Sequence, residues 1–289
     1  MQRKRTYEKN HYHPSEIREM YEFLKEHRSL DFLIKEKDIE KLEMIGAGGF
    51  GKVYRGKYVG QEIAIKDYLK TSQHHHREDF KKELKIISDL KHPNIVLYMG
   101  MCITTEKYIL ITEYLENGSL FDQIHRKKRN FDEEEQLGIA FSIVKGMVYL
   151  HNMKKILHRD LKSSNVLMGE DWEVKLCDFG LSGQKKKKKK KSGRIGTYQW
   201  MAPEVIRNEE KVDEESDVYS FGVIIWEMLT KKIPYQGLSE QQIIGLVGYD
   251  EEHRLEQPEG NQFLLYIMDK CLKRDPRERP TFIEIQSDF

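Results

Sequence analysis

An ordered set of short motifs constrains this chain more strongly than any other feature of its sequence. Residues 157–165 read LHRDLKSSN. The triplet DFG at 178–180 begins thirteen residues after that segment ends, and APE follows at 202–204. Upstream lie the glycine-rich stretch GAGGFGKV at 46–53 and the segment IAIK at 63–66. A glycine-rich stretch alone would be a weak signal, but these motifs in this order are a specific one.

The hydrophobic period along the chain predicts an α+β fold in two lobes. Residues 39–45, 52–56, 63–68, 95–99 and 108–112 have the pattern of strands, and residues 77–90 form an amphipathic helix. Beyond residue 118 the pattern is helical, at 119–127, 132–152, 216–229, 239–247, 262–272 and from 280 onward. Asp132, Ser216 and Ser239 are the predicted helix N-caps. We expect a small strand-rich N-lobe with one main helix and a larger helical C-lobe.

The sequence predicts that the start of the chain is an extension of the main domain. Residues 1–37 form this extension, and an amphipathic helix is predicted near residues 15–28. Its apolar face is expected to pack on the domain behind it, with binding to a partner as the alternative. The main domain then covers residues 38–289, with an N-lobe at about 38–113, a hinge at about 113–118 and a C-lobe at about 119–289.

Composition excludes several classes of function. The chain has 49 Lys and Arg against 48 Asp and Glu, a net charge of +1, so nothing global favours a nucleic acid as partner. A local run of seven lysines, at 185–191, departs from this balance. Cys102, Cys177 and Cys271 form no C-x-x-C pair, which fits a reducing compartment. No apolar run approaches the roughly 18 residues of a membrane span, and no signal peptide is recognised. We therefore expect a cytoplasmic protein without membrane insertion.

From about residue 38 to its end, the chain resembles a eukaryotic protein kinase domain. Within that superfamily it is similar to the tyrosine kinase-like group, near the Raf and mixed-lineage kinases. The segments that carry this second resemblance are 94–100 (NIVLYMG), 158–165 and 196–204 (GTYQWMAPE). The resemblance implies the two-lobe protein kinase fold.

Kinases of this group mostly phosphorylate serine and threonine, despite the group's name. Lys162 agrees with this, because tyrosine kinases have Ala or Arg nearby, and so does Gly196-Thr197 ahead of Trp200. We expect an enzyme that transfers the γ-phosphoryl group of ATP to a Ser or Thr hydroxyl of a protein substrate, in signalling. Two alternatives stay open. One is a dual-specificity or tyrosine kinase, and the other is a non-catalytic scaffold, which the intact motifs disfavour.

The chemistry assigns roles to the motif residues, because phosphoryl transfer needs positioned reactants and neutralised charge. Lys66 should hold the α- and β-phosphates, and Glu83 should pair with Lys66. Asp178 and Asn165 should hold Mg²⁺, with Mn²⁺ as an alternative metal. The cofactors expected are therefore ATP and a divalent cation.

The segment at 157–165, called here the central motif, contains two further residues with expected catalytic roles. Asp160 should accept the proton of the substrate hydroxyl, and Lys162 lies close enough in sequence to meet the transferring phosphoryl group. Ser192, next to the lysine run, is the candidate phosphorylation site of an activation loop. The residues expected to bind the nucleotide are Ile45, Gly46, Gly48, Gly51, Val53, Ala64, Lys66, Thr112, Glu113, Leu115 and Leu167.

The resemblance also implies structural partnerships around these residues. Asp217 would brace the segment at 157–165, and Arg279 would pair with Glu204. Four residues would stack as an internal column of the active state, namely Ile87, Tyr98, His158 and Phe179.

Overall fold

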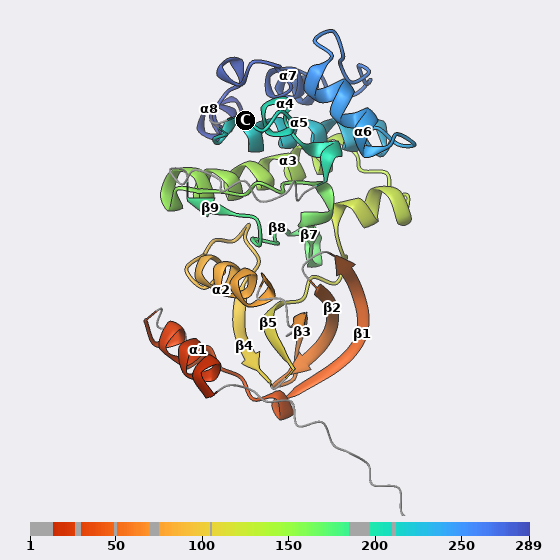
Figure 1. The fold of residues 1–289 in the computed structure, drawn as a ribbon. Coiled ribbons are helices and arrows are strands. Elements are labelled where there is room, and N and C mark those ends of the chain that lie inside the picture. Colours follow the sequence, from red (N-terminus) through yellow and green to blue (C-terminus); the bar gives the residue numbers. More distant parts are fainter. Residues whose placement is uncertain are drawn as a thin grey trace, which may run out of the picture. The chain divides into compact units, whose positions relative to one another are not determined.

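The chain folds into two compact units (Figure 1). The computed structural model describes residues 14–26, 30–48, 51–69, 75–104, 106–184, 197–209 and 212–289. One unit comprises Met1–Ser88 and Tyr98–Glu113, and the other comprises Asp89–Leu97 and Tyr114–Phe289. The first unit, called here the N-terminal unit, contains an antiparallel sheet, and the second, the C-terminal unit, is mainly helical. The expected α+β class, with a strand-rich N-terminal part and a larger helical C-terminal part, is confirmed.

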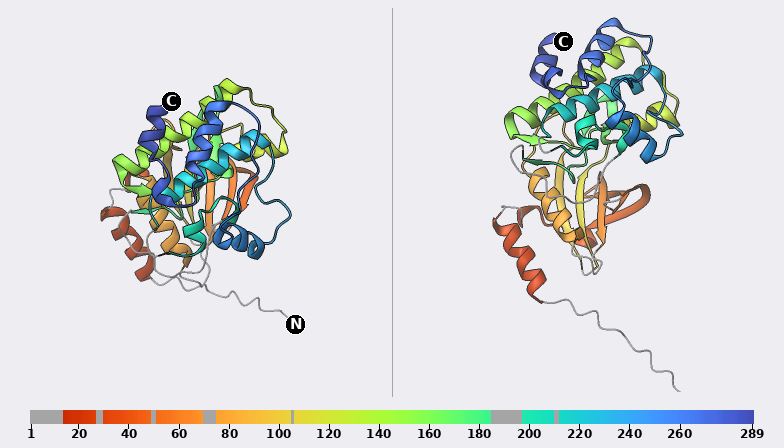
Figure 2. Two further views of the ribbon diagram at one scale, coloured as in Figure 1. Left: turned by 90° about the horizontal axis from the view of Figure 1, so that it is seen from above. Right: turned by 45° about the horizontal axis from the view of Figure 1, so that its top comes forward.

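The N-terminal unit is built on a five-stranded sheet. Its strands are β1 (Ile39–Gly48), β2 (Gly51–Tyr58), β3 (Gln61–Leu69), β4 (Tyr98–Ile103) and β5 (Lys107–Glu113). They pair antiparallel in the order β1-β2-β3-β5-β4. Helix α2 (His75–Ile87) packs on β3 and β5, and helix α1 (Pro14–Glu26) lies beside α2 (Figures 1 and 2). Two short 3₁₀ turns, η1 (Leu30–Phe32) and η2 (Glu36–Asp38), lead into β1.

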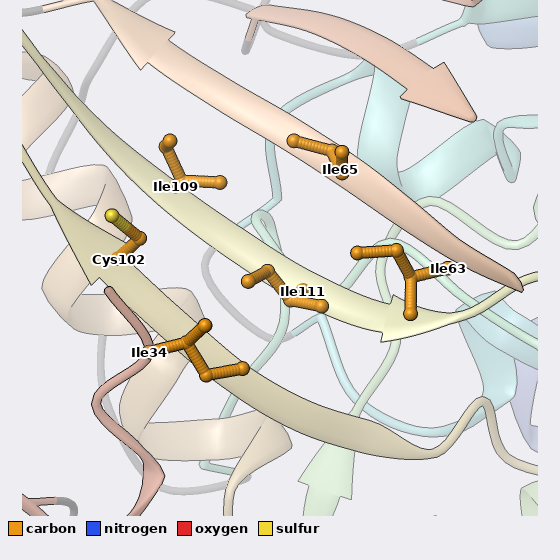
Figure 3. Close-up of a cluster of buried hydrophobic side chains, with 6 residues drawn as sticks. All are labelled: Ile34, Ile63, Ile65, Cys102, Ile109 and Ile111. Carbon is orange, nitrogen blue, oxygen red and sulfur yellow. The ribbon is translucent and has the colours of Figure 1, made fainter. Parts of the chain in front are cut away.

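One face of this sheet is covered by the segment that precedes β1. Side chains alternate along a strand, so Ile63 and Ile65 point to one face and Lys66 to the other. Figure 3 shows the apolar cluster on the first face, made by Ile34, Ile63, Ile65, Cys102, Ile109 and Ile111. Ile34 reaches the sheet because its N–H donates to the Met101 carbonyl at 2.7 Å. A Cβ at Gly100 would clash with Ile34, so the glycine permits this close approach.

The C-terminal unit is organised around the buried helix α5 (Glu215–Thr230), which packs against α7 (Gln262–Cys271). Helix α3 (Glu133–Val148) packs against α8 (Phe282–Asp288). The remaining α-helices are α4 (Pro203–Ile206) and α6 (Glu240–Ile243), and two small antiparallel pairs join β6 (Ile156–Leu157) to β9 (Gly183–Gln184) and β7 (Val166–Met168) to β8 (Val174–Leu176). The shorter turns are η3 (Asp122–Arg126), η4 (Tyr149–Lys154), η5 (Ser163–Asn165), η6 (Glu170–Trp172), η7 (Tyr198–Trp200), η8 (Ile244–Tyr249) and η9 (Pro276–Glu278).

Two of the three predicted N-caps are confirmed. Asp132 and Ser239 each form a capping box with the residue three positions later. The prediction for Ser216 is wrong, because α5 begins at Glu215 and Ser216 lies in its first turn, where its hydroxyl donates to the Asp213 carbonyl at 2.8 Å. Several neighbouring residues can begin a helix here, and the sequence does not distinguish them.

Some predicted bounds also differ from the structure. The predicted strand at 95–99 divides, since Ile95 forms a bridge with Leu176 in the C-terminal unit and β4 begins at Tyr98. The predicted helix at 77–90 ends at Ile87, and the one at 119–127 contains the π-helical turn η3. Within the described residues, the longest apolar helices fall short of what a bilayer crossing requires.

Candidate active site

The N-terminal unit joins Lys66 to Glu83. Lys66 lies on β3 and Glu83 on α2, and the Lys66 ammonium donates to the two carboxylate oxygens at 3.0 and 2.9 Å. Helix α2 presents Glu83 to the sheet because Phe80, Leu84 and Ile87, which share its face, are buried. The Glu83 side chain is only 3% exposed, so the charge of Lys66 compensates a carboxylate removed from water. The Tyr68 hydroxyl also donates to Glu83, a contact that the sequence analysis did not predict.

The glycine-rich strands lie next to Lys66. Gly46 of β1 is opposite Val53 of β2, and Val53 is in turn opposite Lys66 of β3. Gly51 has a φ of +139°, and a Cβ there would overlap the Asp67 carbonyl, so only glycine fits. Ala64 pairs with Thr112 of β5, with Glu113 following at the end of that strand. Ile45 is 42% exposed on β1.

The C-terminal unit gathers the central motif around Asp160. The Lys162 ammonium lies 2.8 Å from Asp160 Oδ2 and donates to the Thr197 hydroxyl at 2.8 Å. The Asn165 amide nitrogen donates to the Asp160 carbonyl oxygen at 2.8 Å and to its carboxylate at 3.2 Å. These contacts fix the direction of the Asp160 carboxylate between a cation and an amide donor.

Asp217 braces this segment, as the resemblance implied. Its carboxylate accepts the backbone N–H groups of His158 and Arg159, both at 2.8 Å, and a hydrogen bond with His151 at 2.8 Å. Burial by itself raises the pKa of a carboxyl group, but the hydrogen bond with His151 and the electrostatic interactions with His151 and His158 hold the pKa of Asp217 below its ordinary value. Asp217 therefore stays ionised and holds the loop as a charged acceptor.

Asn165 and Asp178 offer the oxygen atoms that Mg²⁺ requires. The Asn165 amide nitrogen is directed to Asp160, which leaves its Oδ1 atom as the acceptor on the other side of the amide. The Cys177 N–H donates to the Asn165 carbonyl at 3.0 Å, so Asp178 follows directly after a residue tied to Asn165. Mg²⁺ is commonly bound by one or two carboxylate or carbonyl ligands together with phosphates and water, and this pair of side chains fits that chemistry. The part of the chain that the structure describes contains no cluster of three or more His, Cys, Asp or Glu suited to a metal.

The structure describes the surroundings of most of the remaining predicted residues. Leu115 is 5% exposed, and Leu167 on β7 forms a bridge with Ser119. Arg279 pairs with Glu204 through two hydrogen bonds of 2.7 and 2.9 Å, as the resemblance implied. Ser192 and the lysine run lie outside the described residues.

Sequence reasoning missed Glu227, which ties the central motif to the segment before α4. Its fully buried carboxylate accepts hydrogen bonds from Ser163 at 2.7 Å and Trp200 at 3.0 Å, and contacts His125 at 2.7 Å. The only sign in the sequence was a Glu among the apolar residues of α5, because a carboxylate buried there needs hydrogen-bond partners. Its partners are distant in sequence, and so no local pattern reveals them.

Comparison with known proteins decides the family. The family described as "Protein tyrosine and serine/threonine kinase" matches residues 39–289. The chain belongs to this family. The predicted resemblance to kinases of the tyrosine kinase-like group is thereby confirmed.

Several curated relatives of this kinase domain come from plants and animals. The probable serine/threonine-protein kinase SIS8 of Arabidopsis thaliana is 42% identical over 251 residues, which cover 86% of this chain and 24% of the relative. The serine/threonine-protein kinase CTR1 of the same plant is 41% identical over 254 residues, 86% of this chain and 31% of the relative. Mitogen-activated protein kinase kinase kinase 13-A of Xenopus laevis is 39% identical over 249 residues, 86% of this chain and 25% of the relative. The chain therefore spans about a quarter to a third of these relatives.

Proposed function

We propose that this chain is an ATP- and Mg²⁺-dependent serine/threonine protein kinase domain with a role in signalling. The observation that carries the proposal is the Lys162 ammonium, which contacts both the Asp160 carboxylate and the Thr197 hydroxyl. A lysine in this position is what Ser/Thr kinases carry. The names of the curated relatives agree with the proposal.

The proposed roles follow from the charges of the N-terminal unit. Lys66 holds the α- and β-phosphates, and Glu83 fixes the direction of the ammonium. Backbone N–H groups near Gly46, Gly48 and Gly51 would bind the phosphate oxygens, because glycine leaves no Cβ in the way. Apolar side chains and the backbone of Glu113 and Leu115 would hold the adenine. The residues proposed to line it are Ile45, Val53, Ala64, Thr112 and Leu167.

The C-terminal unit supplies the acceptor chemistry and the metal ligands. Bound Mg²⁺ neutralises the negative charge of the phosphates. Asp178 and Asn165 hold the metal, or Mn²⁺ in its place. Asp160 orients the substrate hydroxyl and accepts its proton at a carboxylate oxygen, while Lys162 neutralises charge on the phosphoryl group.

An Asp160→Asn variant tests the proposal. The purified chain should phosphorylate a generic protein substrate on serine and threonine, as phospho-amino-acid analysis would show. Asp160→Asn should lower turnover about 10²- to 10⁴-fold, because it removes the proton acceptor. Its affinity for ATP should stay within about threefold of the parent, because Asp160 contacts the acceptor hydroxyl rather than the nucleotide.

Asp171→Asn makes the same chemical change at an exposed residue of the same unit and should leave turnover unchanged. Turnover of Asp160→Asn within about tenfold of the parent would contradict the assignment. Phosphotyrosine as the main product would favour the dual-specificity or tyrosine kinase alternative. An inactive parent with normal folding would favour the scaffold.

Four further proposals rest on the sequence. The division into an extension at 1–37 and a kinase domain at 38–289 fits the family match at 39–289. Ser192 is the proposed site of activating phosphorylation. A protein with Ser or Thr acceptors, and no nucleic acid, is the proposed partner. The cytoplasm is the proposed location, supported by three free cysteines.

A further inference from the structure

Strand β3 presents two side chains, rather than one, to Glu83. Lys66 and Tyr68 are two residues apart, so they project from the same face of the strand. The Lys66 ammonium donates to the two carboxylate oxygens of Glu83, and the Tyr68 hydroxyl donates to Oε2. The Glu83 carboxylate is therefore held by a cation and by a neutral donor from one strand.

The environment of Tyr68 keeps its hydroxyl in the form that donates. Tyr68 is fully buried, and burial together with the Glu83 charge raises the pKa of the phenol well above its ordinary value. The neutral phenol suits a buried carboxylate, which needs donors but would be repelled by a second negative charge. A hydrogen bond to a charged group is also stronger than one between neutral groups.

The Tyr68 ring is fixed by aromatic packing that does not depend on its hydroxyl. Phe80 lies one turn before Glu83 on α2, and its ring meets the Tyr68 ring edge-on with centroids 5.6 Å apart. Phe80 in turn stacks on Tyr108 of β5 at 5.0 Å, and Tyr108 is the residue opposite Tyr68 in the sheet. All three rings are buried. A phenylalanine at position 68 would keep this packing and lose only the hydroxyl.

We propose that Tyr68 is a positioning residue for phosphoryl transfer, whose hydroxyl holds the Glu83 carboxylate in place to orient the Lys66 ammonium. The inference rests on the proposed kinase function, in which Lys66 holds the phosphates. Without the hydroxyl, Glu83 loses one of its donors, and α2 loses one of its polar connections to β3. Lys66 then samples directions that do not favour transfer.

Steady-state kinetics of Tyr68→Phe in the full chain test the proposal. We expect kcat to fall about tenfold, the size expected for one hydrogen bond to a charged group, with the KM for ATP within about threefold. Tyr58→Phe is the matched control, since its ring packs on the same sheet against the apolar cluster and its kcat should match the parent. Glu83→Gln should lower kcat more strongly, and adding Tyr68→Phe to it should cause little further loss, because both act through one contact.

Amide hydrogen exchange supplies a readout that is independent of activity. Tyr68→Phe should speed exchange along α2, at residues 75–87, and Tyr58→Phe should not. An unchanged kcat in Tyr68→Phe would overturn the proposal even if exchange rises, because the hydroxyl would then serve the helix alone. Fully additive losses in the double variant would overturn it as well.

The two proposals fail in different ways. If the parent transfers no phosphoryl group, the proposed function fails, and exchange on α2 still decides whether the hydroxyl anchors Glu83. If the parent is active and Lys66→Met is inactive while Tyr68→Phe equals the parent, only the inference about Tyr68 fails.

Discussion

Arg159 and Asp178 adopt a backbone conformation that their residue types disfavour. Their φ angles are 67° and 63°, in the left-handed region, where a non-glycine residue costs about 1–2 kcal/mol. The strain at Arg159 is offset by Asp217, which accepts the N–H groups of both His158 and Arg159. His158 in turn contacts the Cys177 carbonyl at 3.1 Å, directly before Asp178. Such strain held in place by buried partners is typical of functional sites.

The cysteines differ in a way that predicts their reactivity. Burial raises the pKa of Cys102 to about 11, and burial raises the pKa of Cys271 as well. At about pH 8, a thiol with such a pKa is thiolate in roughly one molecule in a thousand. Cys177 is partly exposed and lies next to Asp178. We expect Cys177 to react first with an electrophile attached to an ATP analogue.

Mass spectrometry of the labelled protein checks this expectation. Label should accumulate on Cys177 at least about tenfold faster than on the other two cysteines, and ATP with Mg²⁺ should slow it. Cys177→Ser should abolish the fast phase and leave the slow labelling intact. Faster labelling of Cys102 or Cys271 would show that Cys177 is an inert thiol. Fast labelling of Cys177 without protection by ATP would show that it lies away from the nucleotide.

At the scale of elements, the sequence predicts those structures whose signals are local. The strands of the glycine-rich hairpin, the amphipathic face of α2 and the N-cap of α3 at Asp132 all follow from the hydrophobic period and the residue types. The motif spacing also singled out Lys66, Glu83, Asp160, Asn165 and Asp178 as candidates. The structure joins Lys66 to Glu83 in one unit and Asn165 to Asp160 in the other, and their catalytic roles stay predictions.

Other features depend on partners far away in the sequence and could not be predicted locally. The hydrogen bond from the Tyr68 hydroxyl to Glu83 forms only when α2 packs on β3. Glu227 contacts side chains that lie up to 102 residues away in the sequence. Ile95 has the residue type of a strand, but the pattern does not say that it pairs with Leu176 rather than with β5. The predicted helix at 132–152 is longer than α3, which ends at Val148. The apolar period continues through the π-helical turn η4, and so the sequence pattern does not show this end.

Helix α1 is expected to depend on an ion-pair contact with α2. Glu19 lies 2.8 Å from the Lys81 ammonium and 3.3 Å from the Arg77 guanidinium, and Met20 and Leu24 of α1 are buried. Glu19→Lys would place a third cation there. Because the Glu19 side chain is exposed, loss of its ion pairs should cost only about 1 kcal/mol or less, enough to loosen α1 without unfolding the domain.

Amide hydrogen exchange along residues 14–26 measures this loosening. Exchange in Glu19→Lys should be several-fold faster than in the parent, about fivefold for a change of 1 kcal/mol. Glu22→Lys makes the same charge change at an exposed residue of the same helix and should leave exchange unchanged. Equal rates in Glu19→Lys and Glu22→Lys would mean that apolar packing alone holds α1.

At the scale of the whole molecule, the residues proposed to act in phosphoryl transfer divide between the two units. The N-terminal unit contains the ion pair of Lys66 and Glu83, whereas Asp160, Asn165 and Asp178 belong to the C-terminal unit. The proposed metal ligands therefore come from the C-terminal unit alone. Loss of a ligand there should remove the metal's contribution and retain the nucleotide contacts of the N-terminal unit.

Thermal unfolding of the whole chain with ADP and Mg²⁺ tests this division. A ligand that binds the folded protein at a hundred times its Kd stabilises it by about 2.7 kcal/mol, which corresponds to a rise in Tm of about 5 °C for a chain of this size. In the parent, ADP alone should raise Tm, and Mg²⁺ should raise it further because the metal adds contacts to Asp178 and Asn165. In Asp178→Asn the rise with ADP should persist while the further rise with Mg²⁺ disappears, since an amide is a poorer ligand for a hard cation. Asp269→Asn, at an exposed residue of α7, should behave as the parent. A full Mg²⁺-dependent rise in Asp178→Asn would show that the metal is held elsewhere.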